Sequence, residues 1–110
     1  MWKSLGNKGE KRAAAYLTSK GYKIIERNYR CKLGEIDLIA EKDNIIVFVE
    51  VKTRSNDRFG KGFEAVVHKK IDKIRKVAML YMIQKDLQKE IRFDVISIDD
   101  NVITHFEGAF

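Results

Sequence analysis

The sequence contains no proline, a single cysteine, Cys31, and only two histidines, His68 and His105. One cysteine cannot form an internal disulfide, and with two distant histidines it leaves too few soft ligands for a structural zinc site. Any bound metal would therefore have to lie among carboxylates. No repeat, low-complexity tract or linker-like stretch interrupts the 110 residues, so we expect one domain over residues 1–110.

Long hydrophobic runs are also missing. The two longest apolar stretches, 45–49 and 77–83, are much shorter than the roughly 18 to 20 residues that a membrane-spanning helix requires. The first residues, Met1 to Gly6, lack the apolar core of a secretory signal. We therefore expect a cytoplasmic protein that does not cross a membrane.

Acidic charge is in the minority, with 22 Lys and Arg against 16 Asp and Glu and a net charge of +6. This excess favours a polyanionic partner, nucleic acid above all, over a neutral metabolite. The charge is unevenly spread, because residues 31–50 hold five acids and two bases, a net charge of −3, while the rest of the chain carries +9. An acidic pocket within a basic surface suits a protein that binds both a cation and a polyanion.

The spacing of apolar residues predicts two helices and five strands. The helices are expected over about 7–20, with a capping box at Asn7 and Glu10, and from about 63 to 85. The strands are expected at 22–29, 35–40, 45–53, 90–98 and 102–106, with a basic loop at 54–62. This order, α-β-β-β-α-β-β, favours a mixed sheet of four or five strands with helices packed on it, an α/β or α+β domain.

Two neighbouring strands carry charges among sheet-forming residues, and buried charges must be paired or bound to a metal. If 41–44 is a four-residue loop, Asp37 faces Phe48 and Glu35 faces Glu50. The charged side chains of the hairpin then share one face: Glu35, Asp37, Glu50 and Lys52. Carboxylates this close repel each other unless a cation lies between them, and such oxygen ligands suit Mg²⁺ or Mn²⁺.

A site of this kind holds the parts needed for phosphodiester hydrolysis. The metal would activate a water molecule and neutralise phosphate charge, while Lys52 would orient that water or stabilise the transition state. Glu-Val-Lys in a strand is also common on the solvated face of a sheet, so this triplet alone is a weak signal. It gains weight from Asp37, thirteen residues before Glu50, from Glu10 in the first helix and from the positive net charge.

These residues, in this order, resemble the signature of PD-(D/E)xK nucleases, in which an acid on one strand precedes E-x-K on the next. More closely, the chain resembles the bacterial YraN-like family of the restriction-endonuclease-like fold, which is related to archaeal Holliday junction resolvases. The resemblance runs nearly end to end in short motifs: Gly9-Glu10, Gly21-Tyr22, Arg27-Asn28-Tyr29-Arg30, Gly34-Glu35-Ile36-Asp37-Leu38-Ile39, Phe48-Val49-Glu50-Val51-Lys52-Thr53-Arg54, Arg92-Phe93-Asp94-Val95 and Ala109-Phe110.

The resemblance implies a restriction-endonuclease-like α/β fold, with a mixed central sheet of four to five strands flanked by helices. It implies a Mg²⁺- or Mn²⁺-dependent nuclease that acts on DNA more than on RNA, with branched or distorted DNA as a candidate substrate. A homodimer is expected because related enzymes cut paired strands in that way.

The resemblance also assigns roles to particular residues. Asp37 and Glu50 would be metal ligands together with the backbone carbonyl of Val51, and Lys52 would be the catalytic lysine. Two further residues would assist from the helices: Glu10 and Lys70. Glu35 is interpreted either as an accessory acid or as an ion-pair partner of a nearby arginine, Arg30 or Arg54.

Other charged residues are assigned with less support from the pattern. Four arginines flank the hairpin and are candidate phosphate contacts, although solvated loop charges explain them nearly as well: Arg27, Arg30, Arg54 and Arg58. Lys69, Lys73 and Lys76 are interpreted as the solvated face of the second helix. Asp94 is interpreted as a carboxylate paired at a sheet edge or with a helix, and His68 and His105 as structural or surface residues.

Two alternatives to a nuclease stay open at this point. The chain could be a module that binds nucleic acid in recombination or repair without cleaving it. It could also be an interaction protein whose basic surface binds an acidic partner.

Overall fold

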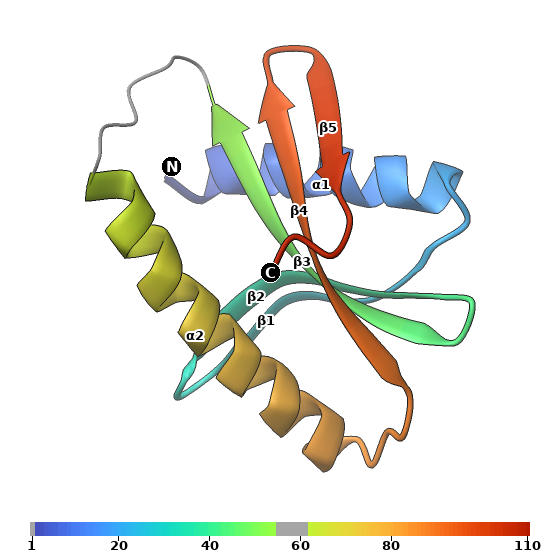
Figure 1. Cartoon of the computed structure of the whole chain (residues 1–110). Coiled ribbons are helices and arrows are strands. Elements are labelled where there is room, and N and C mark those ends of the chain that lie inside the picture. Colours follow the sequence, from blue (N-terminus) through green and yellow to red (C-terminus); the bar gives the residue numbers. More distant parts are fainter. Residues whose placement is uncertain (1, 55–61) are drawn as a thin grey trace.

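The computed structural model describes the backbone of residues 2–54 and 62–110 and the side chains of residues 8–53 and 70–110. The elements are α1 (Trp2–Ser19), β1 (Lys23–Cys31), β2 (Gly34–Lys42), β3 (Ile45–Arg54), α2 (Gly62–Gln84), β4 (Glu90–Asp99) and β5 (Val102–Phe106). Figure 1 shows their arrangement. The predicted order of elements is confirmed, and the chain is a mixed α/β structure. Most of the predicted basic loop, 55–61, lies outside the described residues.

The five strands form one mixed sheet in the order β1-β2-β3-β4-β5. Only β3 and β4 are parallel, and they pair along their whole length, while the other described neighbours are antiparallel. A parallel pair requires a long crossover connection, which α2 supplies. The two helices cover opposite faces of the sheet, as Figure 1 shows.

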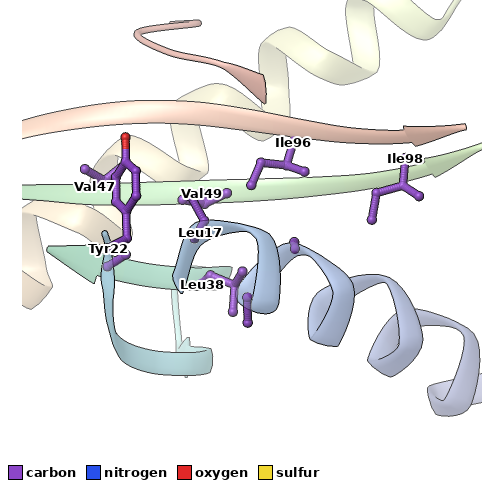
Figure 2. Packing of buried hydrophobic residues seen from close by; sticks show 10 residues of the cluster. Leu17, Tyr22, Leu38, Val47, Val49, Ile96 and Ile98 are labelled. Atoms are coloured by element: carbon purple, nitrogen blue, oxygen red, sulfur yellow. The ribbon is translucent and has the colours of Figure 1, made fainter. Parts of the chain in front are cut away.

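Alternate residues of β3 serve the two faces of the sheet. Val47 and Val49 point toward α1, where they pack with Leu17 (Figure 2). Phe48 points the other way and contacts Tyr81 of α2, with the two ring centroids 6.0 Å apart. Burial on both faces explains why this strand is a continuous apolar, β-branched run in the sequence.

The turn between β2 and β3 is shorter than the predicted four-residue loop. Asp43 and Asn44 have φ angles of 53° and 65°, the left-handed values that a two-residue type I′ turn requires. Glu41 and Lys42 therefore belong to β2 rather than to the loop, and Lys42 pairs with Ile45. Sequence composition identified the turn but not its type.

The shorter turn moves the register of the hairpin by two residues. The last paired residues are Leu38 and Val49. One residue further along each strand, the same register places Asp37 opposite Glu50. The predicted pairs, Asp37 with Phe48 and Glu35 with Glu50, were wrong. Because a shift of two preserves the alternation of side chains, the charged residues still share the predicted face.

The first helix begins earlier than predicted, at Trp2 rather than near Asn7. Asn7 therefore lies inside α1 and does not cap it, so Glu10 is not part of a capping box. Asparagine within a helix is only mildly unfavourable, so the residues before it can continue the helix. Within the described part of the chain, neither helix is long and apolar enough to cross a membrane.

Candidate functional site

Strands β2 and β3 separate at the place where the predicted carboxylates lie. Their pairing ends at Leu38 and Val49, although both strands continue beyond this point. The backbone N–H of Val51 instead donates a hydrogen bond of 2.8 Å to Oδ2 of Asp37. A side chain thus accepts the bond that the neighbouring strand no longer accepts, and the carboxylate is held between the two strands.

An open pocket of about 420 Å³ lies at this separation, between the hairpin and α2. Residues from three elements line it, and five of the seven are charged: Gly34, Glu35, Asp37, Glu50, Lys70, Lys73 and Ile74. Lys52 lies beside it and lines a smaller adjoining cavity with Glu50 and Lys70. The structure therefore brings together the acids of β2 and β3 and the two lysines for which roles were predicted.

Glu50 is the most buried acid of this site, with 4% of its surface exposed. Its Oε2 atom forms ion pairs with Lys70 and, at 3.9 Å, with Lys52. That oxygen accepts no hydrogen bond of good geometry from the described residues. Burial and then the nearby charge of Asp37 raise the pKa of Glu50 to about 7, against the opposing effect of Lys70. A carboxylate in this state favours uptake of a proton or a cation.

Glu10 reaches the same site from α1. Its neighbour Gly9 is buried against β3, where a Cβ atom would overlap Oγ1 of Thr53, so glycine allows the helix to approach the sheet closely. Burial and then the charge of Asp37 raise the pKa of Glu10, while a hydrogen bond with Asn28 opposes the rise. The predicted association of Glu10 with the hairpin acids is thus present in the structure.

Asn28 also belongs to the site, although no role was predicted for it. It lies in β1 between two positions paired with β2, opposite Asp37, and its φ angle is 52°. A left-handed backbone is unfavourable for residues with a Cβ atom, and asparagine is among those that tolerate it best. The available signal was an asparagine, a poor strand former, one residue before the end of the predicted strand 22–29.

The arginines that flank the hairpin are only partly described. Arg27 is exposed on β1. Arg30 pairs with Glu35 at 3.3 Å, so Glu35 both lines the pocket and has the arginine partner that was one of its two interpretations. The side chain of Arg54 and the whole of Arg58 lie outside the described residues, as does the side chain of Lys69.

Lys73 and Lys76 are exposed, as the interpretation of the helix lysines as a solvated face predicts, and Lys73 also lines the open pocket. The reason is the turn between β1 and β2, which approaches α2 at Gly34. This residue has a φ of 149°, and a Cβ atom there would lie 3.5 Å from Val77 and 3.8 Å from Cβ of Lys73. The turn makes part of the exposed helix face into a pocket wall, which helical periodicity alone does not reveal.

A second buried acid, Asp94, lies on the opposite face of the sheet and is fully paired. Arg92 donates two hydrogen bonds of 2.8 Å to it, His105 Nε2 lies 2.7 Å from its Oδ2 atom, and the N–H of Gly108 donates at 3.0 Å. Burial opposes ionisation, but these partners outweigh it and hold the pKa of Asp94 below its ordinary value. The interpretation of His105 as a structural residue fits this network. The described partners of Asp94 lie in β4, in β5 and just after β5, so the carboxylate pairs within the sheet and not with a helix. The side chain of His68 lies outside the described residues.

The fold and the candidate site define the class of this chain: it is a mixed α/β protein with a five-stranded sheet and a carboxylate–lysine pocket. The model of the family described as "Uncharacterised protein family UPF0102" matches residues 9–98. The chain belongs to this UPF0102, or YraN-like, family.

Relatives in several bacteria agree with this assignment. A UPF0102 protein of Sulfurihydrogenibium sp. is 53% identical over 102 residues, which are 92% of this chain and 89% of the relative. One from Thermodesulfovibrio yellowstonii is 48% identical over 106 residues, 96% of this chain and 95% of the relative. One from Syntrophomonas wolfei is 49% identical across the full length of both chains. The predicted resemblance is therefore confirmed at the level of the family.

Proposed function

We propose that this protein is a Mg²⁺- or Mn²⁺-dependent nuclease of the restriction-endonuclease-like fold that hydrolyses phosphodiester bonds in DNA. One observation carries the proposal. Glu50, a buried acid whose pKa is raised to about 7, lies with Asp37 where β2 and β3 separate and is flanked by two lysines. Burying acids next to each other weakens a fold, so the arrangement favours a functional role over a structural one.

The side chains present fit a hard divalent cation. Asp37 and Glu50 offer carboxylate oxygens, and Oε2 of Glu50 accepts no well-placed hydrogen bond from the described residues. Mg²⁺ is commonly bound by one or two carboxylates and completes its shell with water and substrate phosphate. Among the residues whose side chains are described, no three Asp, Glu, His or Cys side chains converge as a metal cluster. The proposed ligand set is the two carboxylates with the backbone carbonyl of Val51, the third ligand that the resemblance to PD-(D/E)xK nucleases implies.

The chain's own residues would serve the reaction in distinct ways. When bound, the metal supplies a coordinated water of lowered pKa and neutralises charge on the phosphate. Lys52 would orient the attacking water or stabilise the pentavalent transition state from beside Glu50. Lys70, ion-paired with Glu50, would keep that acid charged until substrate phosphate enters the pocket. Glu10 would hold the water from the α1 side.

The charge distribution supports a nucleic-acid substrate, because residues 31–50 have a net charge of −3 and the rest of the chain has a net charge of +9. A module that only binds nucleic acid would gain nothing from a buried acid with a raised pKa. The proposal includes a cytoplasmic location, where DNA and Mg²⁺ are both available, and a homodimer when both strands of a duplex are cut.

The test is an incubation of the purified protein with duplex, single-stranded and four-way-junction DNA and with RNA, in Mn²⁺ or in EDTA. Cleavage is expected only with the metal and should fall by about 10²- to 10³-fold in Asp37→Ala and in Lys52→Ala. Glu90→Gln, which changes an exposed acid at the start of β4, is the matched control and should cleave as the wild type does. Cleavage of none of the substrates, or unchanged cleavage in both variants, would overturn the proposal.

A further inference from the structure

A second open groove lies on α2, one helical turn beyond the site pocket. Its volume is about 410 Å³, and it is formed by the β1–β2 turn and the helix: Leu33, Arg75, Lys76, Met79, Leu80 and Ile83. Three of its apolar side chains are strongly exposed, Leu33 at 46%, Met79 at 52% and Ile83 at 72%. Exposed apolar side chains gathered in one groove mark a binding surface rather than ordinary solvated surface.

The groove continues the site pocket. On the turn, Gly34 lines the pocket and the preceding residue, Leu33, lines the groove. On α2, Lys73 lines the pocket and Lys76, one turn further, lines the groove. A ligand that leaves the pocket along α2 therefore passes directly into the groove.

The surface of the groove is almost entirely apolar, and two of the residues that line it, Arg75 and Lys76, are exposed cations. Arg75 and Lys76 suit a polyanion, and with Lys73 they extend the basic surface away from the pocket. Met79 and Ile83 offer apolar contacts that the phosphates of a duplex would not use. An unpaired nucleic-acid strand has both chemistries, because its phosphates are anionic and its unpaired bases leave their π-faces open to contact.

The length of the groove is compatible with a short stretch of strand. From Arg75 to Ile83 the helix rises about 12 Å, at about 1.5 Å per residue. That span corresponds to about three to four nucleotides at a duplex-like spacing of about 3.4 Å. An acidic amphipathic protein segment would also suit the groove, but it would leave the continuity with the pocket unexplained.

We propose that this groove binds an unpaired strand next to the phosphodiester bond in the pocket. The preferred substrate class is then a duplex that carries a single-stranded extension. This inference rests on the proposed function, because it takes the pocket as the place where the strand is cut.

The test is fluorescence anisotropy in EDTA, with a labelled blunt duplex and the same duplex carrying a single-stranded extension. The wild type should bind the extended duplex about tenfold more tightly. In Arg75→Gln/Lys76→Gln this preference should disappear, and the slope of log affinity against log salt should decrease by about 1.4, at about 0.7 per lost single-strand phosphate contact. In Met79→Ser/Ile83→Ser the preference should disappear while the salt slope is unchanged, because no charge is removed.

The matched control is Lys23→Gln/Lys85→Gln, which removes two exposed lysines from a different pocket. It should retain the preference for the extended duplex. Equal binding of the two duplexes by the wild type would overturn the inference, as would retention of the preference in both groove variants, which would favour an acidic protein as the occupant.

Cleavage in Mn²⁺, measured on the same two duplexes, separates this inference from the proposed function. Cleavage that depends on Asp37 but shows no preference for the extended duplex overturns only the inference about the groove. Preferential binding that depends on the groove, without cleavage of any substrate, overturns only the proposed function.

Discussion

Asp94 and Glu50 are buried acids on adjacent strands of one sheet, yet they face opposite sides and have opposite surroundings. Asp94 has no exposed surface and is held by Arg92, His105 and a backbone N–H. Glu50 has 4% exposed surface, and around it lie another acid and the ammonium groups of lysines. Their pKa values accordingly move apart, downward for Asp94 and upward for Glu50.

The difference shows that burial of an acid does not by itself mark a functional site. Asp94 has the partners that ionisation requires, so its charge contributes to the stability of the α1 side of the sheet. Glu50 has two lysine ammonium groups near it but also the negative charge of Asp37, so the α2 side of the sheet holds a pair of acids that a further cation would stabilise. The partners that surround each buried carboxylate, rather than the extent of its burial, distinguish the structural network of Asp94 from the candidate site of Glu50.

The largest effect that tests this comparison concerns stability. Asp94→Asn should lower the free energy of unfolding by about 3 kcal/mol, because it leaves the half-buried Arg92 guanidinium with only the exposed Glu107, 3.7 Å away, as a charged partner. Glu50→Gln should not lower it, because the neutral amide removes a repulsion and the half-exposed Lys70 becomes hydrated instead. Urea unfolding of both variants measures the difference, and equal losses of stability would break the comparison.

The two acids should also give opposite pH dependences of stability in metal-free protein. The folded pKa of Asp94 is lower than its unfolded value, so its contribution is present above about pH 4 and is lost as the pH falls through the folded pKa. The folded pKa of Glu50, about 7, is higher than its ordinary value of 4.5, so stability should fall as the pH rises between these values.

Unfolding free energies measured in EDTA from about pH 3 to about pH 8 test both slopes. Asp94→Asn should flatten the acidic part of the curve, and Glu50→Gln should flatten the part between the two pKa values of Glu50. The comparison fails if either variant keeps the slope of the wild type.

The smallest effect concerns Asn28, which supplies a neutral hydrogen bond to Glu10 at the candidate site. Asn28→Ala should lose about 1 kcal/mol of stability because alanine is disfavoured at a φ of 52°, whereas Asn28→Gly should lose less. Both variants remove the hydrogen bond to Glu10, so both should reduce cleavage equally. The free energy of unfolding and the cleavage rate of both variants test this prediction. If cleavage falls more in Asn28→Ala than in Asn28→Gly, in proportion to the loss of stability, the role of Asn28 is purely structural.

The sequence predicts the elements and the shared face of the acids because both depend on local alternation. The apolar run of β3 and the three-and-four spacing of α2 identify each element without knowledge of its partners. The charged residues of the hairpin stayed on one face even though the turn was misjudged, because the error was an even number of residues. A one-residue error at Asp43 and Asn44 would have separated Asp37 from Glu50.

Other features depend on contacts that no local pattern contains. Lys73 lines the pocket only because Gly34 brings a distant turn against α2. The partners of Asp94 include a histidine eleven residues away and a backbone N–H fourteen residues away. Asn28 joins the site through an unusual φ angle, which sequence composition does not encode. These are the features that distinguish the two buried acids, so the sequence alone could not separate their roles.

The tight Asp43–Asn44 turn also bears on the order in which the chain folds. Asp37 and Glu50 are thirteen residues apart, whereas the β3–β4 partners Ile45 and Glu90 are separated by 45 positions. Closing the short loop takes less entropy, so the hairpin should form first and bring the two acids together while water still screens their repulsion. Docking of α2 then removes that water and delivers Lys70 in one step. The repulsion between the acids thus becomes strong only when its counter-charge arrives.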